Sequence, residues 1–135
     1  MTPTSRLVAI GLLLTFASAE AVALECPARS AQTDDVIASL NEARGCDAAM
    51  KVFEACQFGA SGDVQFGEVV EKKCEADFLD TAKMSRKRSY RRELGVCDRK
   101  YRNRSGTMYL SATAFCRAQA AQRYSREARR AAGAR

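Results

Sequence analysis

Six cysteines are the residues of this chain whose type and spacing most clearly predict chemistry. An even number of cysteines in a small exported chain is typical of a disulfide framework. The closest two in the sequence, Cys46 and Cys56, are ten residues apart, and the chain contains no C-x-x-C motif and no histidine, so zinc binding is not expected. The sequence therefore predicts three disulfides, no metal, no cofactor and no reactive thiol. The six residues are Cys26, Cys46, Cys56, Cys74, Cys97 and Cys116.

Basic side chains are concentrated in the second half of the chain. Residues 24–82 contain 5 Lys+Arg and 12 Asp+Glu, a net charge of −7, whereas residues 83–135 contain 16 Lys+Arg and 3 Asp+Glu, a net charge of +13. The basic segment is either a solvated helix face that attracts the acidic half of the chain, or a surface for anionic polymers or lipid headgroups. The candidate anion-binding residues are Lys83, Arg86, Lys87, Arg88, Arg91, Arg92, Arg99, Lys100, Arg102 and Arg104.

The remaining polar residues do not form a catalytic pattern. The absence of histidine excludes Ser-His, Cys-His and His-metal chemistry. Glu68 and Glu71 would share one helix face, as a glycosidase pair could, but so do most solvated acids on exposed helices. The tyrosines are spaced as core or core-edge residues, and the glycines lack the spacing of a phosphate-binding loop. The sequence therefore predicts that the chain is not an enzyme.

The first 23 residues have the organisation of a cleaved signal peptide. Arg6 is followed by an apolar run of 11 residues, Leu7 to Ala17, and then by small residues at Ala19, Ala21 and Ala23. This run is shorter than the roughly 20 residues that span a bilayer. We expect cleavage after Ala23 or Ala21, a periplasmic or secreted product, and no later transmembrane segment. Glu25 stands before Cys26, where lipid attachment requires a small residue, so a lipoprotein is not expected.

Apolar residues recur at helical spacing throughout the rest of the chain, and no segment alternates as a strand would. The sequence predicts an all-α fold, a small disulfide-stapled bundle of four or five short helices built from helical hairpins. It assigns residues 24–124 to a single domain and predicts that the basic tail 125–135 frays, because that tail lacks an apolar stripe. The expected helices are 34–44, 46–57, 64–79, 82–102 and one that begins near Thr107.

The hairpins also suggest a disulfide pairing. Residues that face each other in an antiparallel helical hairpin have numbers that add up to about twice the centre of the turn. The turn near residues 58–63 then pairs Cys46–Cys74, and the turn near residues 103–107 pairs Cys97–Cys116 within about one helical step. Cys26–Cys56 is left and would tie the N-terminal arm to the first hairpin. Since six cysteines allow many pairings, this pairing is a hypothesis.

Residues 84–126 carry a more specific pattern. Tyr90 precedes Cys97 by seven residues, Asp98 follows directly, and Gly106-Thr107, Cys116 and Arg123 come later. This pattern resembles the second half of the small bacterial secreted lysozyme-inhibitor-like domains, which are helical and stapled by cysteines. Those domains carry a Q-R-A-W-type segment, an acid next to a cysteine, a G-S and a later cysteine with an arginine.

The resemblance covers about a third of the chain and is incomplete. Lys87-Arg88-Ser89-Tyr90 stands for the Q-R-A-W-type segment, Asp98 follows its cysteine instead of preceding it, and the first half does not match clearly. The resemblance implies binding to a lysozyme-like protein in the cell envelope, with the acidic half as the contact side because lysozymes are basic.

The sequence thus favours an exported, non-enzymatic binding module of the bacterial cell envelope. Its partner is a protein in the inhibitor-like interpretation. One alternative is a cationic module that binds anionic envelope polymers or lipid surfaces through residues 83–104, and another is a structural envelope protein without a specific ligand. Export makes intracellular nucleic acid an unexpected partner.

Overall fold

The structure is a computed structural model that describes residues 25–134 as five α-helices. No strand occurs between these residues, so the prediction of an all-α fold is confirmed. No helix in this part of the chain is both long and apolar enough to cross a membrane. The expected signal peptide and its cleavage site lie outside the described residues. The helices are α1 (Thr33–Glu42), α2 (Cys46–Cys56), α3 (Gly62–Glu75), α4 (Met84–Lys100) and α5 (Thr107–Gly133).

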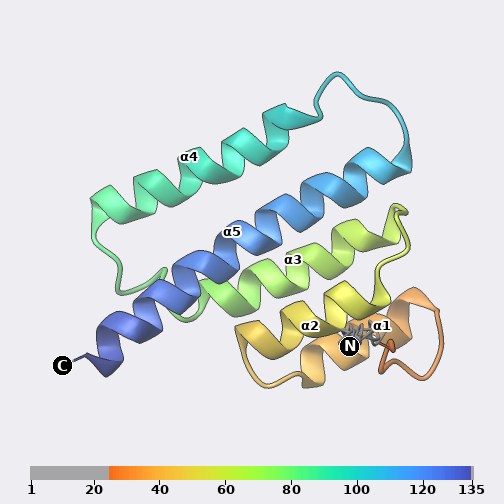
Figure 1. The fold of residues 1–135 in the computed structure, drawn as a ribbon, viewed down its shortest axis with the longest axis horizontal. Helices are drawn as coiled ribbons and strands as arrows, with labels where there is room; N and C mark the ends of the chain where they lie inside the picture. Colours follow the sequence, from red (N-terminus) through yellow and green to blue (C-terminus); the bar gives the residue numbers. More distant parts are fainter. Residues whose placement is uncertain (1–24, 135) are drawn as a thin grey trace, which may run out of the picture.

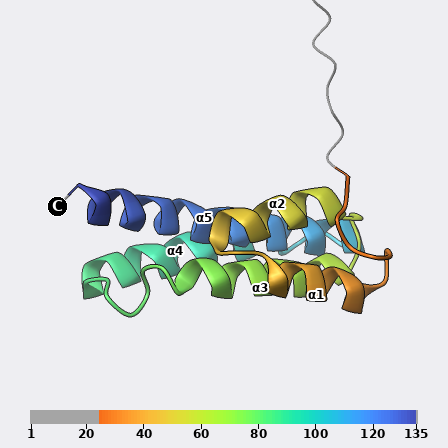
Figure 2. The same ribbon diagram turned by 90° about the horizontal axis from the view of Figure 1, so that it is seen from below.

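The longest helix, α5, organises the bundle. It packs lengthwise against α3 on one side and against α4 on the other, and α1 and α2 form a hairpin that covers α3 (Figure 1). Figure 2 shows the two layers that result, with α5 and α2 in one and α4, α3 and α1 in the other. Among the described helices, the backbone of α4 packs closely against α5 alone, and α4 reaches α3 through side chains only.

Small residues allow α3 and α5 to approach closely. A Cβ atom built on Gly67 would lie 2.9 Å from Ala114 Cβ and 3.1 Å from the Ala114 carbonyl oxygen. Alanines 118, 120 and 121 of α5 are likewise buried in the core. Larger side chains fill the space around this contact, and Phe53 stacks on Phe115 with ring centroids 4.2 Å apart. The core is thus a tight helix contact surrounded by aromatic packing.

Three disulfides staple the helices, in the pairing that the hairpin register predicts. Cys26–Cys56 ties the N-terminal arm to the end of α2, and Cys46–Cys74 joins the start of α2 to the end of α3. Cys97–Cys116 joins the end of α4 to the middle of α5. Disulfides of this kind persist in oxidising compartments outside the cytosol.

The end of α5 differs from the prediction of a frayed tail. Residues 125–133 continue the helix, and Ser125 is fully buried, with its hydroxyl donating to Asp77. Arg126 donates to Asp47 over 2.7 Å, and Arg129 forms ion pairs with both Asp47 and Asp77. The prediction was wrong because it required an apolar stripe, whereas hydrogen bonds and ion pairs to α2 and to the segment after α3 hold this part of α5.

Candidate functional site

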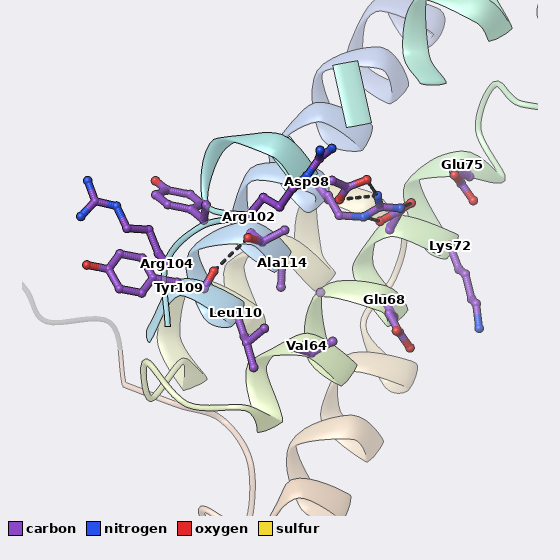
Figure 3. Close-up of a pocket in the computed structure, with 15 residues that line it drawn as sticks. Val64, Glu68, Lys72, Glu75, Asp98, Arg102, Arg104, Tyr109, Leu110 and Ala114 are labelled. Carbon is purple, nitrogen blue, oxygen red and sulfur yellow. Dashed lines mark hydrogen bonds and ion pairs between the residues drawn. The ribbon is translucent and has the colours of Figure 1, made fainter. Parts of the chain in front are cut away.

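A groove between α3 and α4 is one of the cavities among the described residues. Its volume is about 520 Å³, and α5 forms its floor. The groove exists because the backbone of α4 packs on α5 and not on α3. Figure 3 shows the side chains that line it from α3, α5, the end of α4 and the loop after it. They are Val64, Gly67, Glu68, Glu71, Lys72, Glu75, Asp98, Tyr101, Arg102, Arg104, Tyr109, Leu110, Thr113, Ala114 and Arg117.

Arg117 of α5 connects the three helices around the groove. Its Nε and Nη2 donate to the two carboxylate oxygens of Glu71 on α3 over 3.0 and 2.7 Å. Its Nη1 donates to Asp98 on α4, with distances of 2.9 and 3.0 Å to the two oxygens. A planar guanidinium matches carboxylates in this two-pronged way and loses little freedom per hydrogen bond. The polar part of the groove is therefore held rigidly before any ligand arrives.

The carboxylate of Glu71 is the most buried charge in this arrangement, with its side chain 13% exposed. Burial raises the pKa of Glu71 above its ordinary value, and the hydrogen bonds and positive charge of Arg117 oppose this rise. The neighbouring Glu75 accepts a hydrogen bond of 2.9 Å from the hydroxyl of Tyr90. Burial, together with that hydrogen bond, raises the pKa of Tyr90, so the phenol remains a neutral donor.

The outer end of the groove is aromatic and cationic. The rings of Tyr101 and Tyr109 lie with centroids 5.8 Å apart, and the Arg104 guanidinium lies 6.0 Å from the centre of the Tyr109 ring. Lys100 Nζ lies 5.2 Å from the centre of the Tyr101 ring. Arg102 lines the same end. Rigid aromatic side chains beside arginines are the composition that protein–protein contacts favour most.

The ten predicted anion-binding residues lie in several different parts of the structure. Arg102 and Arg104 line the groove, while Lys83 and Arg86 line a second hollow between the start of α4 and the end of α5. Arg86 is engaged there, because it pairs with Glu127 and lies over the Tyr124 ring, 4.4 Å from its centre. Lys87 donates to the backbone oxygen of Asp80 over 3.4 Å.

Four of the ten residues form a stripe on the outer face of α4, which we call the arginine stripe. They are exposed, and the helical repeat places them opposite the buried Tyr90, Leu94 and Cys97. No carboxylate of residues 25–134 forms an ion pair with any of them. The stripe consists of Arg88, Arg91, Arg92 and Arg99. Anion binding by these residues stays a prediction.

Sequence reasoning missed the arginines that do bind carboxylates within the chain. Arg117, Arg123, Arg126 and Arg129 of α5 pair with acids of α2, α3, α4 and the segment after α3. The attraction expected between the basic and acidic halves is therefore supplied largely by α5 and less by residues 83–104. A signal for it was present, since 123, 126 and 129 recur every three residues and so share one side of a helix.

The sequence and the overall structure were also compared with known proteins. No protein-family model, no curated protein and no solved structure matches the chain.

Proposed function

We propose that this chain is an exported, non-enzymatic binding module of the bacterial cell envelope, and that it binds a protein partner through the groove between α3 and α4. The leader-like residues 1–23 support export, and the three disulfides fit the oxidising periplasmic or extracellular space. The partner proposed is a lysozyme-like protein, so the action would be inhibitor-like.

The observation that carries this proposal is the fixed floor of the groove. Arg117 is held by Glu71 and Asp98 on either side, so a partner that enters the groove does not have to order these groups. Binding to a preorganised surface avoids much of the entropy cost of association. The same geometry supports a non-catalytic role, because Glu71 is occupied by Arg117 and cannot serve as one of two free carboxylates.

The charges of the α3 wall fit a basic partner. Glu68 and Glu75 line the groove, and neither forms an ion pair within residues 25–134. By contrast, α5 arginines pair with Asp47 and Asp77 elsewhere on the acidic half. A lysine or arginine of a lysozyme could pair with Glu68 or Glu75 on this wall.

The test is the inhibition of cell-wall lysis by a lysozyme, with a variant that fills the groove. Thr113 lines the groove on α5, whereas Gln119 of the same helix is exposed and lies outside it. We expect the wild-type chain and Gln119→Trp to block lysis at near-stoichiometric ratio, and Thr113→Trp to lose the block. Equal inhibition by both variants would place the contact elsewhere, and no inhibition by the wild type would exclude a lysozyme partner.

A second candidate function rests on the arginine stripe. Four exposed guanidiniums that have no carboxylate partner among residues 25–134, along about 16 Å of helix, suit an anionic envelope polymer. The wild-type chain should then be retained on a heparin or phosphate matrix and elute with salt. Changing Arg88, Arg91, Arg92 and Arg99 to glutamine should lower the eluting salt concentration, and an unchanged elution position would exclude the stripe as the polymer site.

A further inference from the structure

Exposed apolar side chains gather at one end of the bundle. Among the described residues, five large apolar side chains are exposed, and three of them are Phe58 in the loop before α3 and Met108 and Leu110 at the start of α5. Figures 1 and 2 both place this loop and the start of α5 at the same end of the molecule. We call Phe58, Met108 and Leu110 the apolar tip.

A buried carboxylate holds the two parts of the apolar tip together. Asp63, which is fully buried, accepts hydrogen bonds from the backbone N–H groups of Phe58, Gly59 and Ala60. It also accepts a hydrogen bond of 2.6 Å from the hydroxyl of Ser111, which follows Leu110 in α5. Phe58 is therefore presented outward from a fixed backbone and not from a loose loop. Phe58 and Met108 are 54% and 61% exposed in this fixed arrangement.

Cations lie beside the part of the apolar tip that belongs to α5. Lys100, Arg102 and Arg104 lie in the segment that leads into α5, and the chain contains no Asp or Glu between Arg99 and Arg126. Tyr101 and Tyr109 lie beside these cations, and Tyr109 stands directly between Met108 and Leu110 in the sequence. On the side of Phe58, the exposed Glu54 lies four residues earlier in the chain, and Asp35 of α1 is bound by Arg29.

Exposed apolar side chains beside basic and aromatic residues have the chemistry of a surface that docks on a membrane. Phenylalanine, methionine and leucine enter the boundary between headgroups and acyl chains, whereas arginine and lysine remain on the lipid phosphates. Tyrosine prefers the same interface. A soluble polyanion would use the cations and leave the apolar side chains in water, so it does not account for their exposure.

We infer that the apolar tip and the adjoining Arg102 and Arg104 dock the chain on an anionic lipid bilayer. This inference goes beyond the proposed protein partner. Leu110, Arg102 and Arg104 also line the groove, whereas Phe58 and Met108 do not, so Phe58 and Met108 distinguish the two proposals. Docking by this end would leave the second hollow, at the start of α4, in solvent.

The experiment is co-sedimentation of the chain with vesicles of phosphatidylcholine alone or with one quarter phosphatidylglycerol. The protein is purified from the periplasm of an expressing bacterium, so that it is tested as processed. We expect binding to the vesicles that contain phosphatidylglycerol and little binding to phosphatidylcholine alone. Phe58→Ser with Met108→Ser should weaken the partition by about tenfold or more, because both side chains lose their contact with the acyl boundary.

A matched control comes from the other two exposed apolar residues. Met84 and Val96 of α4 are 59% and 55% exposed but do not belong to the apolar tip, so Met84→Ser with Val96→Ser should leave the partition unchanged. Arg102→Gln with Arg104→Gln should also weaken it by about tenfold or more. Circular dichroism should show that all variants keep the helix content of the wild type.

Three results would overturn the inference. The first is no binding to either vesicle, and the second is an equal loss from the control pair and the tip pair. The third is binding that depends on the arginines but is untouched by Phe58→Ser with Met108→Ser, which would identify a polyanion contact in place of a lipid one. We expect Phe58→Ser with Met108→Ser to inhibit a lysozyme as the wild type does. Failure of the membrane-docking inference and failure of the groove proposal are therefore distinguishable.

Discussion

Replacement of Arg117 by methionine tests whether the guanidinium holds the three helices around the groove. Methionine keeps most of the unbranched stem, so the change removes the charge and the hydrogen bonds with little loss of packing. The pair with Glu71 has side chains 30% and 13% exposed, and its loss leaves a largely buried carboxylate without its partner. The pair with Asp98, whose side chain is 51% exposed, contributes less. After a discount for this exposure, we expect the free energy of unfolding to fall by about 2–3 kcal/mol.

The loss should depend on pH in a defined direction. Burial raises the pKa of Glu71 above its ordinary value of 4.5, and Arg117 opposes that rise, so Arg117→Met should raise the pKa of Glu71 further. Between the unfolded and folded pKa values, the folded state binds more protons than the unfolded state. The free energy of unfolding therefore falls as the pH rises through this window, and the deficit of the variant should be larger near pH 7 than near pH 4.5.

Urea unfolding followed by circular dichroism, with the disulfides intact, measures both effects. Glu71→Gln combined with Arg117→Met should recover part of the loss, since a neutral amide does not suffer the burial of an unpaired charge. A free energy of unfolding for Arg117→Met within about 0.5 kcal/mol of the wild-type value at both pH values would contradict this role of Arg117, because that is the range of an ordinary surface substitution.

Three other changes test a close helix contact, a buried carboxylate and a disulfide. Gly67→Ala should destabilise the fold by about 1–3 kcal/mol in thermal melts, because its Cβ would meet α5 at 2.9 Å, and a neutral effect would contradict the close helix contact. Asp63→Asn should cost on the order of 3 kcal/mol in urea unfolding, since four donors lose a charged acceptor, and wild-type stability would show that the loop does not depend on it. Removal of the Cys97–Cys116 disulfide by serine substitution should cost about 3 kcal/mol for its 19-residue separation, and an unchanged melting temperature would argue against that bond.

The helices and disulfides could be predicted because they depend on local periodicity. Tyr90, Leu94 and Cys97 recur at steps of four and three, and the structure buries all three on one side of α4. The disulfide pairs followed from the same hairpins, because cysteines on facing helices are close only when the register is right. Helix boundaries were less accurate, and α3 ends at Glu75 where the sequence predicted residue 79.

The groove could not be predicted because its parts come together only in three dimensions. Glu71, Asp98 and Arg117 belong to three different helices, and nothing in the sequence indicates that they meet. Gly67 likewise has no local signal, since only the approach of Ala114 explains why a side chain is excluded there. The anchored end of α5 was missed for the same reason, because its partners Asp47 and Asp77 are distant in the sequence.

The central claim, that the groove is where a protein partner binds, is tested most directly by nuclear magnetic resonance. The chain is labelled with nitrogen-15, and amide and arginine side-chain signals are followed while a lysozyme is added. We predict that the largest shifts occur at Tyr101, Thr113 and the Nε–H of Arg117, which line the groove, with few at the exposed face of α2. Shifts confined to the arginine stripe, or no shifts at a lysozyme concentration that inhibits lysis, would contradict the claim.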